Sequence, residues 1–364
     1  MFIKEKGYFV NQVIHNSIIK TKKEGRGFMK RRFIGLMMSL VLVVTLMVGC
    51  ASKSEGTTAP TGTNEPTKSA GTDKKQFRVA YIARTQSDSF AAWLANEMKA
   101  AAKEYSDITL DVFDGQADDE KENAAIENAI TNGYDAIIVQ PNNGEAQRPY
   151  VEKIVKAGII AITTNARIAG IEGASSVDAD PYKQAAVNAA LAVKEVPQNG
   201  KVVVLNGPSG NFHADERRKA WKAEFFDKRT DVKIIAEDIA NWNKDEAMAF
   251  MEDWQTANGK IDAIISMNDN MAAGALEVVS DPTKILSYGV DGTAEACLLI
   301  QEGKMTSTCL QSAIDLAALN LETVHKLLTG EQKQIDTDIN EVLITKDNAG
   351  EFVSMYKERG LIKE

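Results

Sequence analysis

The chain has 364 residues, of which 44% are hydrophobic, so it is long enough for two ordinary domains and too apolar to be disordered. Residues 1–49 hold nine Lys and Arg and two Asp and Glu, which leaves 33 basic and 49 acidic residues, a formal charge of −16, on the remainder. This acidity disfavours nucleic acid as a partner, because nucleic acid needs a basic surface. With only three His and three Cys, we expect no metal site and no cofactor.

A short apolar run near the N-terminus follows three cations. Residues 30–32 are basic, residues 33–48 are almost all apolar, and the run ends at Cys50. It is shorter than a membrane-spanning helix and has the parts of a secretory signal peptide. Residues 46–50 (Leu-Met-Val-Gly-Cys) resemble the bacterial lipobox, whose cysteine is lipidated. We expect residues 1–49 to be a signal peptide and the protein to lie outside the cytoplasm, lipid-anchored to the outer face of the cell membrane or in the periplasm. An uncleaved membrane anchor is the alternative.

Two flanking segments are interpreted from composition. Residues 1–28 fit no export pattern, whereas Met29 would be a conventional start, so our hypothesis is that residues 1–28 are not translated. A real but long basic region is the alternative. Residues 50–75 follow as the lipidated Cys50 and a flexible linker, since Ser, Thr, Gly, Pro, Lys and Glu dominate and no apolar period is present.

From Phe77 onward, short apolar strands alternate with amphipathic helices. The first run is predicted to hold strands at 78–83, 108–113, 135–139 and 159–163, with helices at 90–105, 118–132 and 145–157. The second run, after Asp180, is predicted to hold helices at 182–193, 215–228, 244–256 and 271–279, with strands at 201–205, 232–235, 263–266 and 284–288. Such alternation is typical of parallel sheets covered by helices on both faces. The predicted fold class is therefore α/β, with two doubly wound lobes.

The loops after the strands are rich in polar and aromatic side chains. In open α/β sheets, ligands bind beyond the carboxyl ends of the strands. These loops contain residues 86–90, 140–143, 164–167, 211–217, 241–243, 268–270 and 291–292. Carboxylates accept hydrogen bonds from hydroxyls, Arg donates them, and Asn or Gln does both. Aromatic faces cover the C–H side of a sugar ring. The loops suit a neutral ligand with many hydroxyl groups.

Several motifs resemble a known family. Residues 268–275 closely match its Asn-Asp-x-Met-Ala-x-Gly-Ala signature, and residues 88–90, 217–221, 289–292 and 308–311 match its other motifs in order. From Val79 to the C-terminus, the chain resembles the periplasmic sugar-binding proteins of the ribose and galactose type, the type I solute-binding proteins of ABC importers. The resemblance implies two lobes joined by three crossings, near residues 177–181, 308–311 and 340–345. The N-lobe would comprise residues 76–179 and 312–338, and the C-lobe residues 180–311 and 339–364.

The resemblance also implies a set of ligand-binding residues. Carried over by position, they are Asp88, Phe90, Gln140, Asn165, Arg167, Arg217, Trp242, Asn268, Asp291 and Gln311, with Asn211 and His213 as a second tier. Ribose binders have an adjacent acid-arginine pair where this chain has Asn165-Ala166-Arg167, so whether Arg167 reaches the ligand stays open. The residues alone leave other roles open: helix caps for Asp88 and Asn268, core packing for Phe90 and Trp242, and a solvated charge for Arg217.

The implied function is an extracytoplasmic solute-binding lipoprotein that captures a sugar or polyol and delivers it to an ABC importer permease. We expect a monomer that touches the membrane only through its lipid, and no enzymatic activity, because no nucleophile–base pair stands out. The alternative is a sensor that presents a sugar to a chemoreceptor or histidine kinase. Asp269 is expected to cap a helix or orient a neighbour. Cys297 and Cys309 are either two buried thiols or a disulfide.

Overall fold

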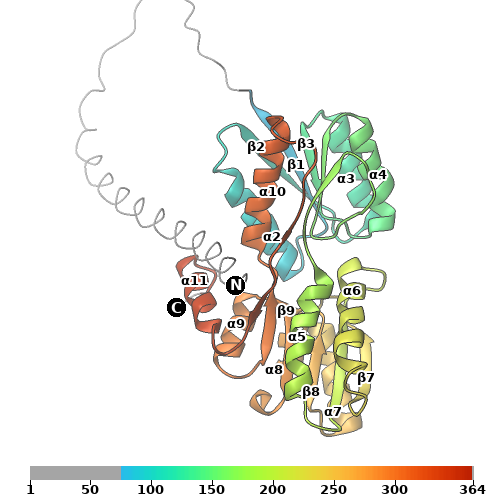
Figure 1. Cartoon of the computed structure of the whole chain (residues 1–364), viewed down its shortest axis with the longest axis vertical. Coiled ribbons are helices and arrows are strands. Elements are labelled where there is room, and N and C mark those ends of the chain that lie inside the picture. Colours follow the sequence, from blue (N-terminus) through green and yellow to red (C-terminus); the bar gives the residue numbers. More distant parts are fainter. Residues whose placement is uncertain (1–74, 363–364) are drawn as a thin grey trace, which may run out of the picture. The chain divides into compact units, whose positions relative to one another are not determined.

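A computed structural model describes residues 75–362 as two lobes, each built on a six-stranded sheet (Figure 1). The predicted signal peptide, Cys50 and almost all of the predicted linker lie outside the described residues. Among the described helices, none has the length and apolar character needed to cross a bilayer.

The sheet of the N-lobe has the strand order β11-β5-β4-β3-β1-β2, and all its pairs are parallel. Its strands are β1 (Phe77–Ala83), β2 (Ile108–Asp114), β3 (Ala136–Val139), β4 (Ile160–Thr164), β5 (Ala174–Ala179) and β11 (Asp336–Ile339). Its helices are α2 (Ser89–Ala102), α3 (Asp119–Thr131), α4 (Gly144–Lys156) and α10 (Ala313–Leu328).

Alternation along β1 gives the N-lobe two cores. Val79 and Tyr81 point to the face covered by α2 and α10, whereas Ala80 and Ile82 point to the face covered by α3 and α4. Successive side chains of a strand lie on opposite faces, so a strand with helices on both sides is apolar throughout. Five of the seven residues of β1 are apolar and fully buried, from Val79 to Ala83, which explains its continuous apolar sequence.

The sheet of the C-lobe has the order β12-β10-β9-β8-β6-β7, with β12 antiparallel to β10 and the other pairs parallel. Its strands are β6 (Lys201–Asn206), β7 (Lys233–Ile239), β8 (Ala263–Ser266), β9 (Leu286–Asp291), β10 (Ser307–Leu310) and β12 (Val342–Ile344). Its helices are α5 (Pro181–Glu195), α6 (Phe212–Trp221), α7 (Lys244–Asn258), α8 (Asp269–Glu277), α9 (Ala294–Gln301) and α11 (Ala349–Glu358).

The chain passes between the two sheets three times. It leaves the first sheet after β5, returns to it after β10, and leaves again between β11 and β12. The predicted α/β class with two doubly wound lobes is confirmed, with the antiparallel β12 as the one exception to parallel pairing among the described strands.

Some predicted elements differ from the structure. The helix expected at 215–228 is α6, which starts at Phe212, followed by a π-helical turn at Lys222–Phe226. Strand β5 was not predicted, because its sequence Ala-Ser-Ser-Val-Asp-Ala lacks an apolar run, yet all six residues are buried. Cys297 and Cys309 are free and buried, so the alternative of two thiols holds rather than the disulfide.

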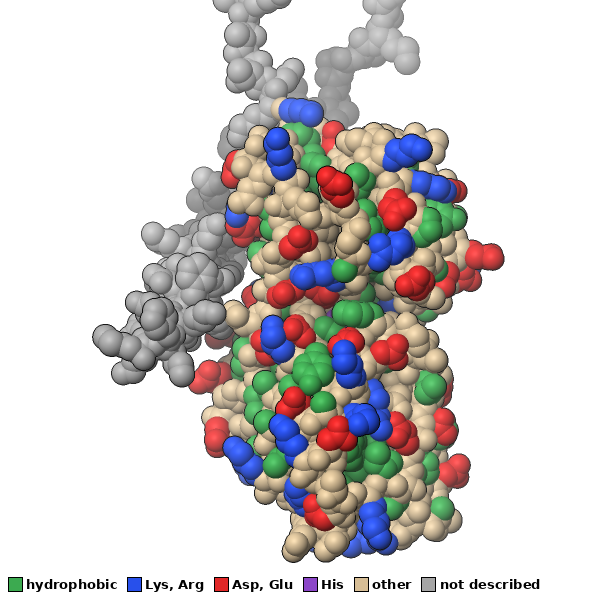
Figure 2. Space-filling model, turned by 45° about the vertical axis from the view of Figure 1, so that its right-hand side comes forward, with side chains coloured by type: hydrophobic (Ala, Val, Ile, Leu, Met, Phe, Trp, Pro, Cys, Tyr) green, Lys and Arg blue, Asp and Glu red, His purple; other side chains and the backbone are tan. Residues whose placement is uncertain are grey.

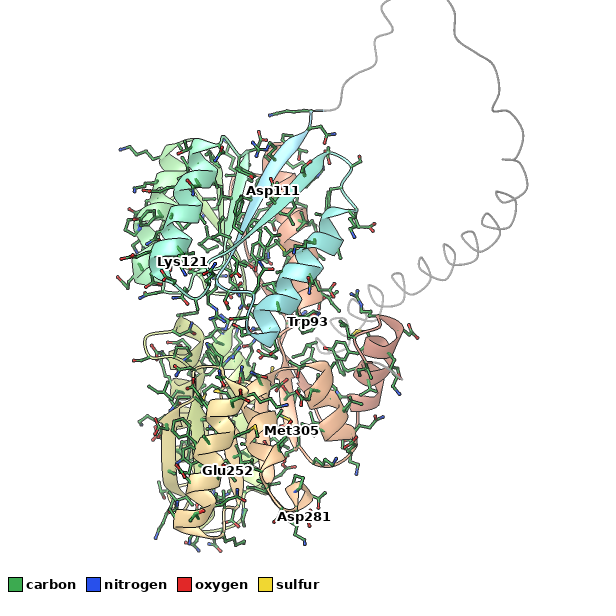
Figure 3. All side chains as sticks on the ribbon, turned by 180° about the vertical axis from the view of Figure 1, so that it is seen from behind. Trp93, Asp111, Lys121, Glu252, Asp281 and Met305 are labelled. Atoms are coloured by element: carbon green, nitrogen blue, oxygen red, sulfur yellow. The ribbon has the colours of Figure 1, made fainter. Side chains whose placement is uncertain are left out.

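Helices α2 and α11 connect the two lobes directly. Trp93 of α2 packs against the cores of both lobes and lies toward the end of α2 nearest the second lobe (Figure 3). Its ring centroid is 5.8 Å from that of Tyr356 in α11. Arg359, just after α11, pairs with Glu97 of α2 at 3.0 Å. The lobes therefore touch through side chains as well as through the three crossings.

Candidate functional site

A cavity lies where the carboxyl ends of the two sets of strands face each other, and its empty space, part of which is open solvent, amounts to about 430 Å³. Its N-lobe side is lined by Arg84, Asp88, Phe90, Gln140, Pro141, Asn165 and Ala166. Its C-lobe side and the second crossing contribute Asn211, His213, Arg217, Trp242, Asn268, Asp291 and Gln311. This is the place where open α/β sheets bind ligands.

Asp88 and Phe90 come from the start of α2. The Asp88 side chain caps this helix by accepting a hydrogen bond from the backbone N–H of Ala91 at 2.8 Å. Its other oxygen accepts a hydrogen bond from the guanidinium of Arg84, which follows β1. Phe90 is 7% exposed and belongs to the N-lobe core. Each residue thus has both the structural role left open by the sequence and a place in the cavity wall.

Gln140 presents a hydrogen-bond donor to the cavity. Its Oε1 accepts hydrogen bonds from the Tyr81 hydroxyl at 2.9 Å and from the backbone N–H of Arg84 at 3.4 Å. Because a backbone N–H can only donate, Oε1 must face β1. The Nε2 group of Gln140 has no partner within residues 75–362, so it remains available to a ligand.

Asn165 presents a hydrogen-bond acceptor from the end of β4. It adopts the left-handed region at φ 54°, which Asn tolerates better than most residues. Its Oδ1 is buried and has no hydrogen-bond partner among the described residues. A buried polar atom without a partner is costly unless a ligand or water satisfies it.

Trp242 is held in an unusual conformation at the cavity wall. Its φ is 60°, a left-handed value that is rare for a bulky residue. Its carbonyl oxygen accepts a hydrogen bond from Asn270 Nδ2 at 2.8 Å. Its ring packs on Gly207, where any added Cβ would collide with the indole. Backbone strain of this kind clusters at functional sites.

Asp291 is a buried carboxylate without a hydrogen-bond donor among the described residues. It ends β9 at φ 124°, is 2% exposed, and has its nearest cation, Arg217 Nη2, at 3.8 Å. Burial raises its pKa well above the usual range, Arg217 counteracts this, and the nearby Asp269 adds to it. Such a group gains from ligand hydroxyls that donate hydrogen bonds to it.

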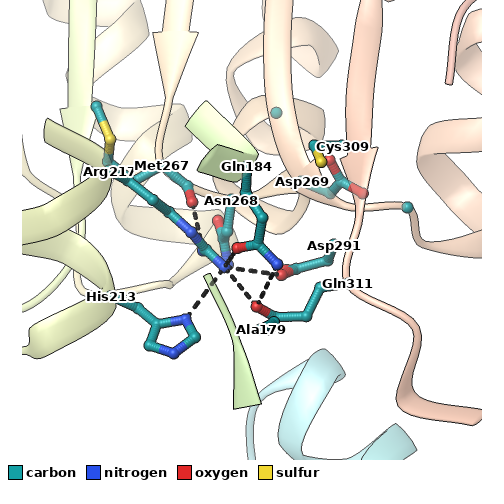
Figure 4. Close-up of polar contacts among 12 residues, drawn as sticks. Ala179, Gln184, His213, Arg217, Met267, Asn268, Asp269, Asp291, Cys309 and Gln311 are labelled. Carbon is teal, nitrogen blue, oxygen red and sulfur yellow. Dashed lines mark hydrogen bonds and ion pairs between the residues drawn. The ribbon is translucent and has the colours of Figure 1, made fainter. Parts of the chain in front are cut away.

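Arg217 is buried rather than solvated, being 2% exposed. Its Nη1 donates to the carbonyl of Met267 at 2.7 Å, and its Nη2 donates to Gln184 Oε1 at 2.9 Å and Gln311 Oε1 at 2.8 Å (Figure 4). Burial lowers its pKa. A guanidinium nevertheless stays charged in proteins, so Arg217 is a fixed cation in the cavity wall.

His213 is a neutral ring beside this cation. Burial lowers the pKa of its imidazole. Arg217 Nη2 lies 3.3 Å from its Nδ1, and because Arg only donates, a hydrogen bond between them requires Nδ1 to accept, with the ring proton on Nε2. That Nε2 has no hydrogen-bond partner among residues 75–362 and lies 3.6 Å from Asp178 Oδ1.

Asn268 lines the cavity, whereas its neighbour Asp269 bonds to other residues of the C-lobe. Asn268 caps α8 through a 2.9 Å hydrogen bond from Met271 N–H and also lines the cavity. Asp269 does not line it. Its carboxylate accepts hydrogen bonds from the Thr308 hydroxyl at 2.6 Å and the Thr293 N–H at 2.8 Å, while burial raises its pKa to about 7.

The structure brings nine of the ten candidate residues together around one cavity, along with the second-tier Asn211 and His213. Arg167 is the exception. It is not among the lining residues, and its Nη2 pairs with Asp338 Oδ1 of β11 at 2.6 Å. Sequence reasoning missed Arg84, although an Arg directly after a strand was a signal of the same kind as the others. No cluster of three or more His, Cys, Asp and Glu suited to a metal ion occurs in the described part of the chain.

Comparisons with known proteins agree with this arrangement. A family model described as a periplasmic binding protein domain matches residues 79–332. The xylitol-binding protein of Mycolicibacterium smegmatis is 29% identical over 226 residues, which cover 61% of this chain and 64% of that protein. The ribose import binding protein of Bacillus subtilis is 24% identical over 298 residues, covering 82% of this chain and 94% of that protein.

A solved structure covers a similar share of the chain. An ABC transporter solute binding protein from Bacillus halodurans C-125, with bound myo-inositol, superposes with a TM-score of 0.72 at 25% identity, covering 78% of this chain and 99% of that one. The resemblance predicted from the sequence motifs is thereby confirmed, and the chain belongs to the periplasmic binding protein family.

Proposed function

We propose that this protein captures a neutral sugar or polyol, cyclitols included, between its two lobes and delivers it to an ABC importer. The observation that carries this proposal is the balance of charge and hydrogen-bonding groups around the cavity. The lining holds two guanidinium groups, Arg84 and Arg217, and two carboxylic acid side chains, Asp88 and Asp291. A charged ligand would leave one of these buried charges uncompensated, which is costly, whereas a neutral ligand would not.

The unsatisfied atoms favour hydroxyl groups in particular. The Nε2 of Gln140 can donate a hydrogen bond, while Asp291 and the Oδ1 of Asn165 can accept one. A hydroxyl group both donates and accepts, so adjacent hydroxyls match this mixture better than a purely apolar or purely acidic ligand. Phe90 and Trp242, from opposite lobes, offer rings to the apolar faces of such a molecule. Xylitol, ribose and myo-inositol, which appear in the descriptions of the proteins compared above, all have adjacent hydroxyl groups.

Contacts from both lobes tie ligand binding to closure. Asp88 and Phe90 belong to the N-lobe, and Trp242 and Asp291 belong to the C-lobe, so a ligand can contact all four only when the lobes are together. Binding then shifts the population toward the closed form, which is the form an importer would recognise. We prefer import to presentation to a chemoreceptor or histidine kinase, because the Bacillus subtilis relative is described as an import binding protein and the Bacillus halodurans structure as an ABC transporter protein.

The remaining parts of the proposal concern location and partners. Lipidation at Cys50 after removal of residues 1–49 would hold the protein outside the cytoplasm, with residues 50–75 as a tether and the importer permease as its partner. We propose a monomer without enzymatic activity. Figure 2 shows basic and acidic side chains interspersed over both lobes on the face in view, without a continuous basic patch for nucleic acid.

A thermal-shift screen of the purified mature protein tests the proposal. The panel comprises pentoses, hexoses, inositols, linear polyols and small organic acids. A ligand at about a hundredfold above its Kd adds about 2.7 kcal/mol of stability. We expect a neutral sugar or polyol to raise the melting temperature, and to be recovered unchanged after incubation. A shift produced only by acids would contradict the ligand class, and a chemical product would contradict the absence of catalysis.

A further inference from the structure

Gln184 stands behind the cavity wall and has no place in the function proposed so far. It lies on α5, the first helix after the first crossing, and is 1% exposed. It is not among the residues that line the cavity. Its Oε1 accepts a hydrogen bond from Arg217 Nη2 at 2.9 Å, and its Nε2 donates one to Gln311 Oε1 at 3.0 Å. Arg217 Nη2 also donates to that same Gln311 oxygen at 2.8 Å, so the three side chains close a triangle (Figure 4).

The chemistry of Arg217 fixes the orientation of both amides in this triangle. Arg can only donate, so the atom of Gln184 that meets it must be the acceptor Oε1. The Nε2 of Gln184 is then left to donate, and the atom of Gln311 that receives it must be an oxygen. Arg217 imposes the same choice on Gln311 independently. The assignment of oxygen and nitrogen in both side chains therefore follows from one donor-only group rather than from the similar shapes of the two ends of an amide.

The triangle leaves one group of Gln311 free. Gln311 lines the cavity at the second crossing between the lobes, and both of its side-chain hydrogen bonds within residues 75–362 are made by Oε1, so its Nε2 has no partner there. With Oε1 occupied by two donors, the group that Gln311 can offer a ligand is the N–H donor. A ligand group that can only donate would meet a second donor there.

We propose that Gln184 is a positioning residue that holds Gln311 with its Nε2 donor toward the ligand, so that this end of the cavity selects an oxygen that can accept a hydrogen bond. This inference rests on the proposed function, because it concerns the same cavity and the same neutral ligand. Gln184 acts through Gln311 and Arg217 and does not touch the ligand itself.

A double-mutant cycle tests the inference. The mature protein is titrated by calorimetry with xylitol, ribose and myo-inositol, and the tightest binder serves as the probe for Gln184→Met, Gln311→Met and the double variant. Methionine retains the length of glutamine and removes its hydrogen bonds. We expect Gln184→Met alone to weaken probe binding about fivefold, because Gln311 then keeps only its bond to Arg217 and its Nε2 is no longer held firmly toward the ligand. In the Gln311→Met background, the same change should weaken binding less than about twofold.

Asn188→Leu is the matched control. Asn188 is fully buried one turn further along α5, and its amide bonds to Gly289 O at 2.7 Å and the Ser307 hydroxyl at 2.7 Å, neither of which belongs to a cavity-lining residue. We expect this variant to lower the melting temperature but to leave probe affinity within about twofold. Gln311→Glu tests the donor itself: it can still accept from Arg217 and Gln184, yet it offers the ligand an acceptor, so it should bind no better than Gln311→Met.

The outcomes separate this inference from the proposed function. If the wild type binds none of the compounds in the thermal-shift panel, the proposed function fails. The double-mutant cycle is then measured on melting temperatures without ligand. If the losses of stability of the two single variants simply add in the double variant, the triangle is overturned. If the wild type binds and Gln184→Met binds equally well, only this inference fails. Equal weakening by Gln184→Met with and without Gln311, or wild-type affinity in Gln311→Glu, would also overturn it.

Discussion

Gly207→Ala adds one methyl group against the ring of Trp242 and should displace it from the cavity. The backbone at Gly207 is not in the left-handed region, so alanine itself is tolerated there. The new Cβ would instead fall among the indole carbons of Trp242, which cannot yield freely because the Trp242 carbonyl is held by Asn270. Overpacking of this kind costs about 1–3 kcal/mol of stability. Loss of an aromatic contact with the ligand costs about 1 kcal/mol, or about fivefold in Kd.

Urea unfolding and calorimetric titration with the best ligand of the screen measure these two effects. Gly350→Ala is the control, because its Cβ would meet only Gln301 Nε2 at 3.6 Å, and neither residue lines the cavity. We expect Gly350→Ala to bind as the wild type does. In a Trp242→Ala background, Gly207→Ala should have no further effect on affinity, since the ring it displaces is absent. A loss of affinity that is the same with and without Trp242 would refute the reasoning.

Three further predictions concern titration and thiols. Burial raises the pKa of Glu122 to about 8, against 4.5 ordinarily, so the folded chain holds this proton more tightly than the unfolded chain. The free energy of unfolding should therefore fall as pH rises from about 4.5 to about 8, by at most about 1.4 kcal/mol per pH unit. Urea titrations of Glu122→Gln should show a smaller dependence of this free energy on pH. An unchanged dependence would contradict the prediction. Ligand hydroxyls that donate to Asp291 should lower its raised pKa, so binding should release protons and weaken as pH falls; a binding enthalpy independent of the ionisation enthalpy of the buffer would contradict this. Burial raises the pKa of the Cys297 and Cys309 thiols, which should react with a thiol reagent only after unfolding; a lower melting temperature under reducing conditions would point instead to a disulfide.

Residues close together in sequence made much of the fold and site predictable. The apolar strands β1 and β3 stand out because each is covered on both faces. Asn268 and Asp291 could be placed at the cavity because each follows or ends a buried strand, and the carboxyl ends of parallel strands share one edge of a sheet. The helix-cap role of Asp88 and its role in the cavity were not rival alternatives, since a cap at this edge of the sheet already faces the ligand.

Contacts between distant residues could not be predicted in the same way. Arg167 lies two positions after Asn165, yet it pairs with Asp338, 171 residues away, because β11 joins the edge of the N-lobe sheet beside β5. Gln184 offered no signal, because its helix position is one of many and its partner Gln311 is 127 residues further along. Strand β5 was missed for a related reason: its Ser and Asp residues are buried by tertiary packing that no local pattern reveals.

Calorimetric titration of the best neutral ligand into three variants tests most directly whether the cavity between the lobes is the binding site. In the cavity wall, Trp242→Ala removes an aromatic ring and Asp291→Asn removes a carboxylate. Arg167→Ala instead removes a partly exposed side chain that pairs with Asp338. We expect affinity to fall at least about fivefold in the first two variants and to stay within about twofold of the wild type in the third. Equal affinity in all four proteins would contradict this expectation, since the ligand would then bind elsewhere.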